Sequence, residues 1–356
     1  MRTHRARRVY TPLLAAAAAV ASLLGAASAG CGAEPATPPA DVTLVLAAYS
    51  TPREVMETQI VPAFAAEWRA KTGKTLRVEA SYLASGAQTR AVLGGFAADV
   101  VLLAMTPDVD KLAGADLVAK TWADGPDRGI VVTSVVAFAV RTGNPKGIRG
   151  WADLARPGVS VLMPNPKTSG GAMWNISALW GAALRGEAGF PPADHDASRD
   201  YLRAVLGNVA VLDKGGRESV ITFEKGVGDV AVTYETEIVA AHLAGRKYDA
   251  VIPALTLLIE IPAAVVAKNA ATHGVTKEAE AFVAFLRSDT AQRAFAHHGF
   301  RGPDGARPAD IATTTTATTP TTLFRIDDMG GWKKVVPALF GPECAFTKTW
   351  ERVYAE

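Results

Sequence analysis

Short apolar runs alternate with amphipathic stretches from residue 41 onward, and this alternation constrains the fold of the chain more than any other feature. Residues 130–140 (IVVTSVVAFAV) are an almost uninterrupted β-branched run, which is typical of a buried strand. Residues 61–68, in contrast, carry apolar side chains at the i, i+3, i+4 and i+7 positions of a helix. The alternation predicts an α/β fold with mainly parallel central sheets and helices on their faces.

The same patterns locate individual elements. Strands are expected at residues 41–48, 76–80, 98–104, 130–140, 159–163, 209–212 and 229–234, and helices at 174–186, 197–205, 217–225, 235–244 and 276–295. Thr51, Pro52 and Glu54 have the spacing of a helix N-cap, a first helical residue and a third one, which predicts a capping box. Pro62 is expected to kink the helix that follows. The Thr-rich residues 312–322 are expected to form a flexible surface excursion.

The first thirty residues have the pattern of an export signal. Four arginines precede a charge-free Ala/Leu run that ends in small residues at Ala29. A transmembrane anchor is the alternative, since the run is nearly long enough to span a bilayer. Cleavage after Ala29 and cleavage before Cys31 are both compatible with the residues, and the second would make Cys31 a lipidated cysteine. Residues 31–40, rich in Pro and Ala, would then be a tether.

Cysteine and histidine usage argues against metal chemistry. The chain has two cysteines, so Cys344 is expected to be a lone thiol if Cys31 is lipidated, or to pair with Cys31 if cleavage follows Ala29. His297 and His298 are adjacent, which on a helix points them about 100° apart, and no spacing typical of a metal site occurs. We therefore expect no metal and no cofactor.

The charge balance changes once the export signal is set aside. Four of the 37 basic residues lie in the first ten positions, so a chain that starts at Cys31 keeps 33 basic against 35 acidic residues, a net charge of −2. Nucleic acids and anionic membranes are bound by concentrated positive charge. We expect neither as a partner, and contact with a membrane only through a lipid anchor.

Four turns place small or hydroxyl residues before an expected helix. They are residues 49–51, 85–86, 168–171 and 214–217. The first N–H groups of each helix lack intrahelical acceptors and lie at the positive end of the helix dipole, so several such turns together would bind an anion without a cationic side chain. A single turn of this kind is usually only a helix cap. A serine nucleophile at Ser169 is the alternative, although no motif supplies a base for it.

Residues 165–175 (NPKTSGGAMWN) resemble the NPKSSGGARWN signature of periplasmic sulfate-binding proteins, the receptors of sulfate and thiosulfate ABC importers. Six further segments are similar to segments of that family in the same order. They are residues 48–54, 98–104, 141–146, 212–217, 228–235 and 324–332. The resemblance therefore extends from about residue 41 to the C-terminal part of the chain.

This resemblance implies a two-lobed periplasmic binding protein of type II, which binds its anion in a cleft and delivers it to the permease subunits of an ABC importer. Residues 41–127 and 257–356 would form lobe I, residues 128–256 lobe II, and the protein would be a monomer and not an enzyme. Carried over position by position, the anion-binding residues would be Ser50, Ser85, Ser169, Gly170, Gly171, Gly216 and Tyr234. A secreted serine hydrolase that uses Ser169 is the alternative function.

Four positions depart from the family pattern. Ser50 replaces Asp, Gly216 replaces Ala, Met173 replaces Arg and Tyr234 replaces Trp. Neutral donors alone match sulfate, which only accepts hydrogen bonds, whereas hydrogen phosphate needs an acceptor for its proton. Glu218 could supply that acceptor if it entered the cleft. Sulfate is thus expected, with thiosulfate, molybdate and phosphate left open.

Overall fold

The computed structural model describes residues 40–308, 320–342, 344, 346–347 and 350. The predicted export signal, Cys31 and most of the Thr-rich segment lie outside these residues. The strands are β1 (Val42–Tyr49), β2 (Leu76–Leu83), β3 (Val100–Leu102), β4 (Ile130–Val140), β5 (Val161–Pro164), β6 (Val209–Asp213), β7 (Val230–Tyr234), β8 (Asp249–Val251), β9 (Leu255–Val265) and β10 (Thr322–Phe324). The helices are α1 (Arg53–Val55), α2 (Val61–Thr72), α3 (Ser85–Leu93), α4 (Thr106–Gly114), α5 (Gly170–Ala183), α6 (His195–Gly207), α7 (Gly216–Glu224), α8 (Glu235–Leu243), α9 (Ala267–His273), α10 (Thr276–Phe285), α11 (Asp289–His297) and α12 (Trp332–Phe340).

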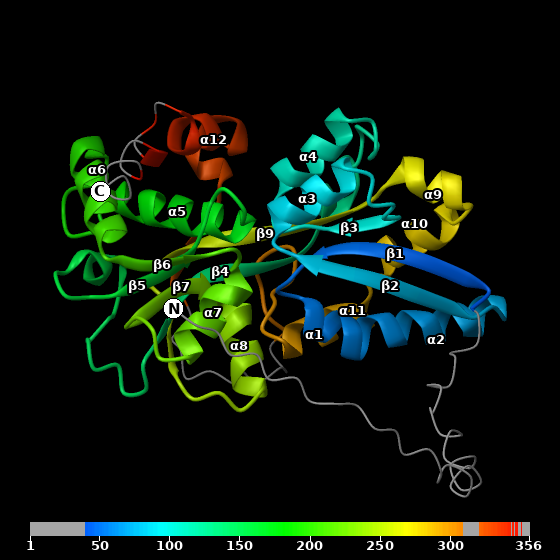
Figure 1. The fold of residues 1–356 in the computed structure, drawn as a ribbon, viewed down its shortest axis with the longest axis horizontal. Coiled ribbons are helices and arrows are strands. Elements are labelled where there is room, and N and C mark those ends of the chain that lie inside the picture. The colour runs from blue at the N-terminus through cyan, green and yellow to red at the C-terminus, as the bar shows by residue number, and fades with distance from the viewer. Residues whose placement is uncertain (1–39, 309–319, 343, 345, 348–349, 351–356) are drawn as a thin grey trace, which may run out of the picture. The chain divides into compact units, whose positions relative to one another are not determined.

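The described strands form one mixed, curled sheet in the order β2-β1-β3-β9-β4-β7-β5-β6, with β10 beside β9 and β8 beside β4 (Figure 1). Parallel pairs lie towards both ends of this order, for example between β1 and β2 and between β5 and β6. The long strands β4 and β9 pair antiparallel with each other at the centre. β9 also pairs with β3, and β4 with β7, so these two strands connect the halves of the sheet.

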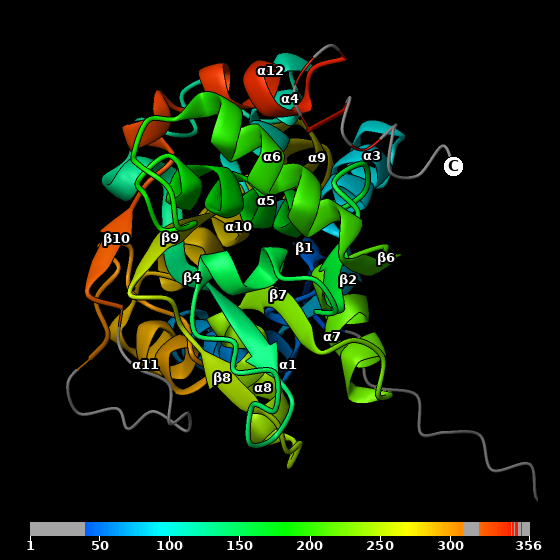
Figure 2. The same cartoon turned by 90° about the vertical axis from the view of Figure 1, so that its left-hand side faces the viewer.

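Helices cover both faces of the sheet. Figure 1 shows α3, α4, α5 and α6 on one face, and α1, α2, α7 and α8 on the other. Figure 2 shows the same separation of α3 to α6 from α1, α7 and α8 in a view turned by 90°. Every residue of β4 is buried. Burial on both faces explains why the sequence of β4 is a continuous apolar run and does not alternate between apolar and polar residues.

The start of the first helix differs from the prediction. α1 begins at Arg53, Pro52 occupies the N-cap position, and no side chain caps the helix, so the capping box expected at Thr51 is wrong. The irregularity expected near Pro62 is present as a π-helical turn at Met56–Ile60, directly before α2. Pro62 has no N–H to donate to a carbonyl in the preceding turn, and the wider π turn accommodates this loss.

Two further differences concern the second half of the chain. The helix expected at residues 276–295 is two helices, α10 and α11, because Ser288 interrupts it and its Oγ accepts a hydrogen bond from the N–H of Ala291 as an N-cap. β9 was not among the expected strands. The other expected elements, including β4 over residues 130–140, are confirmed with shifts of a few residues at their ends.

The C-terminal segment packs against the half of the sheet that includes β7 and β5. The Phe324 ring of β10 lies over Gly181 of α5, and Trp332 of α12 stacks edge to face on Trp174, with ring centroids 4.7 Å apart. Figure 1 shows α12 beside α5 and α6. The lobe boundaries inferred from the resemblance stay a prediction.

Candidate functional site

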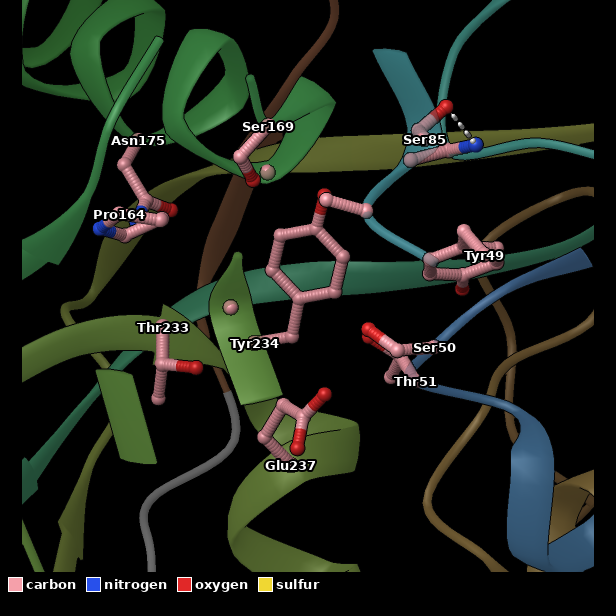
Figure 3. Close-up of a pocket in the computed structure, with 14 residues that line it drawn as sticks. Tyr49, Ser50, Thr51, Ser85, Pro164, Ser169, Asn175, Thr233, Tyr234 and Glu237 are labelled. Carbon is pink, nitrogen blue, oxygen red and sulfur yellow. Dashed lines mark hydrogen bonds between the residues drawn. The ribbon is translucent and has the colours of Figure 1, made fainter. Parts of the chain in front are cut away.

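A pocket enclosing about 340 Å³, part of it open to solvent, lies where the chain enters several helices (Figure 3). Ser85 opens α3, Ser169 is the N-cap of α5, Gly216 opens α7 and Tyr234 is the N-cap of α8. The described residues that line the pocket are Tyr49, Ser50, Thr51, Ala84, Ser85, Ala104, Pro164, Ser169, Gly171, Asn175, Gly216, Thr233, Tyr234 and Glu237. Residues at the starts of four helices therefore line one pocket, where β1, β5 and β7 end. The first N–H groups of a helix lack intrahelical acceptors.

The start of α5 is closely packed against the other residues of this pocket. The hydroxyl oxygen of Ser169 accepts a hydrogen bond from the N–H of Ala172 at 3.3 Å, which leaves its hydrogen free to donate. A Cβ on Gly170 would lie 3.3 Å from the Cβ of Ser85, and one on Gly171 would lie 3.4 Å from the hydroxyl oxygen of Tyr234. Glycine at both positions lets neighbouring groups, or a ligand, approach the backbone closely.

Ser85 has a different environment. Its hydroxyl donates to Asp108 Oδ2 at 2.6 Å and accepts from the N–H of Ala104 at 3.0 Å. The single hydroxyl hydrogen of Ser85 is thus committed to a buried carboxylate in this structure.

Several buried polar atoms at the pocket have no hydrogen-bond partner in the described residues. They are the hydroxyl oxygens of Tyr49, Thr233 and Tyr234, the amide oxygen of Asn175 and both carboxylate oxygens of Glu237. Burial raises the pKa of Tyr234 well above its usual range, and the charges of Glu237 and Asp108 add to this effect, so the phenol stays neutral and able to donate. Figure 3 shows the ring of Tyr234 between Ser169 and Glu237. Unpaired buried polar groups are costly, so these atoms indicate that a polar ligand or water completes the site.

The carboxyl group at the pocket belongs to Glu237 and not to Glu218. Glu237 is 1% exposed, and its Oε2 lies 2.9 Å from Nε of Arg217, which also pairs with Glu54 at 2.8 Å. The Glu237–Arg217 contact is an ion pair that lacks hydrogen-bond alignment. Burial raises the pKa of Glu237, while the nearby Arg217 opposes this shift. Glu218 is not among the described lining residues.

The structure gathers most of the residues that the sequence suggested. Ser50, Ser85, Ser169, Gly171, Gly216 and Tyr234 line the pocket, and Gly170 lies against Ser85 at its edge. Their role as anion-binding residues stays a prediction. Eight further described lining residues were not among the predicted anion-binding residues, namely Tyr49, Thr51, Ala84, Ala104, Pro164, Asn175, Thr233 and Glu237. Glu237 could have been found, since it follows Tyr234 by three residues and therefore shares its face of α8.

Comparison with known proteins gives a consistent result. The family model of bacterial extracellular solute-binding proteins matches residues 44–301. The sulfate-binding protein of Synechococcus elongatus is 39% identical over 99% of both chains. The chain belongs to the bacterial extracellular solute-binding proteins. The thiosulfate-binding protein of Pseudomonas aeruginosa is 35% identical and covers 79% of this chain and 83% of its own length. Among solved structures, the sulfate-binding protein SubI from Mycobacterium tuberculosis H37Rv has a TM-score of 0.74 at 37% identity, covering 84% of this chain and 99% of its own.

Family membership accounts for the chemistry of the pocket. The fold is that of periplasmic binding proteins, and the chain is an exported solute-binding protein and not an enzyme. Among the described lining residues there is no histidine, lysine or cysteine that could activate the hydroxyl of Ser169. Within the described part of the chain, no group of His, Cys, Asp and Glu could hold a metal ion, and no helix is long and apolar enough to cross a membrane.

Proposed function

We propose that this solute-binding protein captures sulfate, or the related thiosulfate, in the pocket and delivers it to the permease subunits of an ABC importer. One observation carries the proposal: the starts of α3, α5, α7 and α8 meet at a buried pocket whose hydroxyl groups are neutral. Backbone N–H groups and hydroxyls bind a dehydrated anion well in a site with little water, because hydrogen bonds to a charged acceptor are about twice as strong as neutral ones. The names of the relatives agree with this ligand class.

The balance of donors and acceptors favours sulfate over hydrogen phosphate. Sulfate carries no proton near neutral pH and only accepts, so it matches the N–H groups and the free hydroxyl hydrogen of Ser169. The carboxylate of Glu237 is the acceptor that could admit a protonated anion. Its Oε2 lies 2.9 Å from Nε of Arg217, and this ion pair competes with a protonated anion for the carboxylate.

Isothermal titration calorimetry with sulfate, thiosulfate, molybdate and hydrogen phosphate tests the proposal. We expect sulfate or thiosulfate to bind most tightly and phosphate not to compete at equal concentration. Phosphate that competes, with that preference lost in Glu237→Gln but kept in Glu218→Ala, would overturn the sulfate assignment. Turnover of sulfate esters or model carboxyl esters would instead favour a serine hydrolase that uses Ser169.

The proposal also includes the division into lobes, the monomeric state and the lipid anchor. The lobes would be residues 41–127 with 257–356, and residues 128–256, joined where β4 and β9 pass from one to the other. Closure of these lobes around the anion would let a monomer present it to the importer. Lipidation at Cys31 would hold the protein at the outer face of the membrane.

A further inference from the structure

A second buried carboxylate lies just outside the proposed anion pocket. Asp108, in the first turn of α4, is 2% exposed, and its Oδ2 accepts the hydroxyl of Ser85 at 2.6 Å. The charge of Asp108 contributes, after burial and Glu237, to raising the pKa of Tyr234, so its field reaches the pocket. A bound anion would therefore be repelled by Asp108 unless a cation neutralises it.

The hydroxyl of Ser85 can donate a hydrogen bond to an anion only if it stops donating to Asp108. Its oxygen already accepts from the N–H of Ala104, and its one hydrogen is donated to Asp108. If the hydroxyl turns to an anion in the pocket, Asp108 Oδ2 loses this donor in a buried position. Leaving a buried carboxylate oxygen without a partner is unfavourable.

Lys111 supplies the positive charge that neutralises Asp108, and a second hydrogen-bond donor to its carboxylate. It follows Asp108 by three residues on α4, and its Nζ lies 2.9 Å from Asp108 Oδ1, while its side chain is 57% exposed. In the described part of the chain, Lys111 is the one cation within ion-pair distance of Asp108. The helix packed against α4 is α3, and its one charged residue, Arg90, forms no ion pair with Asp108.

We propose that Lys111 sets the anion affinity of the pocket by neutralising Asp108, so that the Ser85 hydroxyl can turn from Asp108 to the bound anion. This inference rests on the proposed function. Lys111 is a positioning residue here, because it acts on the anion through Asp108 and Ser85.

Calorimetry with inorganic sulfate on the full chain tests the role of Lys111. We expect Lys111→Met to raise the dissociation constant about three- to fivefold, at the upper end of the range of a partly exposed ion pair, and Lys111→Arg to leave it within about twofold. Lys120→Met is the matched control, since Lys120 is 77% exposed and pairs with Asp116 on the surface. In an Asp108→Asn background, Lys111→Met should have no further effect, because the charge it neutralised is gone.

Binding kinetics separate this role from general attraction of anions and do not depend on the Asp108 variant folding. Stopped-flow fluorescence should show a faster off-rate and an unchanged on-rate for Lys111→Met. Three results would overturn the role of Lys111. The first is a slower on-rate with an unchanged off-rate in Lys111→Met. The others are the same loss of sulfate affinity in the Asp108→Asn background, or an affinity of Lys111→Met equal to that of Lys120→Met. A wild-type chain that binds no sulfate would overturn the proposed function itself, whereas sulfate binding that is indifferent to Lys111 would overturn only this inference.

Discussion

Ser169, at the start of α5, is expected to take part directly in anion binding. Ser169 is the N-cap of the helix, where its hydroxyl oxygen accepts from the N–H of Ala172. The hydrogen of this hydroxyl has no acceptor among the described residues. The same side chain thus contributes to the stability of the helix and to the proposed binding. The two contributions can be separated by comparing a substitution that removes the hydroxyl with one that keeps it.

Ser169→Ala is expected to weaken sulfate binding by about 1.5 to 3 kcal/mol, or roughly ten- to 150-fold, because one charge-assisted hydrogen bond is lost. It should also lower the free energy of unfolding by about 1 kcal/mol through loss of the N-cap. Ser169→Thr keeps a hydroxyl and a cap, and is the control. Calorimetry gives the first quantity and urea unfolding the second. Unchanged affinity in Ser169→Ala would remove Ser169 from the anion site.

Glu237 links stability to pH. Burial raises its pKa in the folded protein above the ordinary value of 4.5, so the folded state holds this proton more strongly than the unfolded state. The stability that Glu237 contributes is therefore fully present below pH 4.5 and is lost as pH rises through the raised pKa.

We expect the difference in unfolding free energy between the wild type and Glu237→Gln, measured without sulfate, to fall as pH rises above 4.5. Urea unfolding at a series of pH values measures it, with the exposed Glu280→Gln as a surface control. A difference that rises with pH would contradict a raised pKa of Glu237.

At the scale of elements, the contact between α5 and β10 fixes the C-terminal segment. Gly181 lies in the interior of α5, where alanine would be the better helix former by about 1 kcal/mol. A Cβ at this position, however, would lie 2.8 Å from Cζ of Phe324 and 3.0 Å from Sδ of Met329. Packing therefore opposes helix propensity at this site.

We expect Gly181→Ala to lower the free energy of unfolding by about 1 to 2 kcal/mol, because overpacking outweighs the gain in propensity. The matched control is Gly207→Ala at the end of α6, where no atom lies within 4 Å of the new Cβ. That control should be neutral or stabilise by up to about 1 kcal/mol. Denaturant unfolding of both variants measures the contrast, and equal stabilisation by the two would show that Phe324 moves aside at little cost.

At the scale of the whole molecule, attachment to the membrane is expected to depend on residues before β1. The apolar run that ends at Ala29, and the Pro/Ala-rich residues after Cys31, favour lipidation of this cysteine. Cys31→Ser should therefore move the protein from the membrane fraction of its native host to the soluble fraction. Cys344→Ser, which removes the free thiol near the C-terminus, should leave the distribution unchanged. Wild-type protein that is soluble and begins at Gly30 would contradict the lipid anchor.

Local sequence determined the elements and the turns. Burial and helix capping act on neighbouring residues, so local sequence patterns predict them directly. Examples are the β-branched run at 130–140 and the hydroxyl and glycine residues at 168–171. For this reason β4, β7 and the start of α7 agree closely with prediction, whereas α5 begins at Gly170 and not at the expected residue 174. Ser288 shows the limit of this reasoning, since apolar periodicity continues across the break that its N-cap makes between α10 and α11.

Only the tertiary structure decided which turns meet. The strand order brings the end of β1 beside the starts of α3, α5 and α7, although these segments lie far apart in the sequence. Which acid reaches the pocket depends on the same non-local packing, since Glu218 and Glu237 both lie in the first turn of a helix but α8 alone points its acid to Tyr234 and Arg217. Sequence periodicity shows which face of an element is buried but not against what, and so Asn175 and the Asp108–Lys111 pair became visible only in the folded chain.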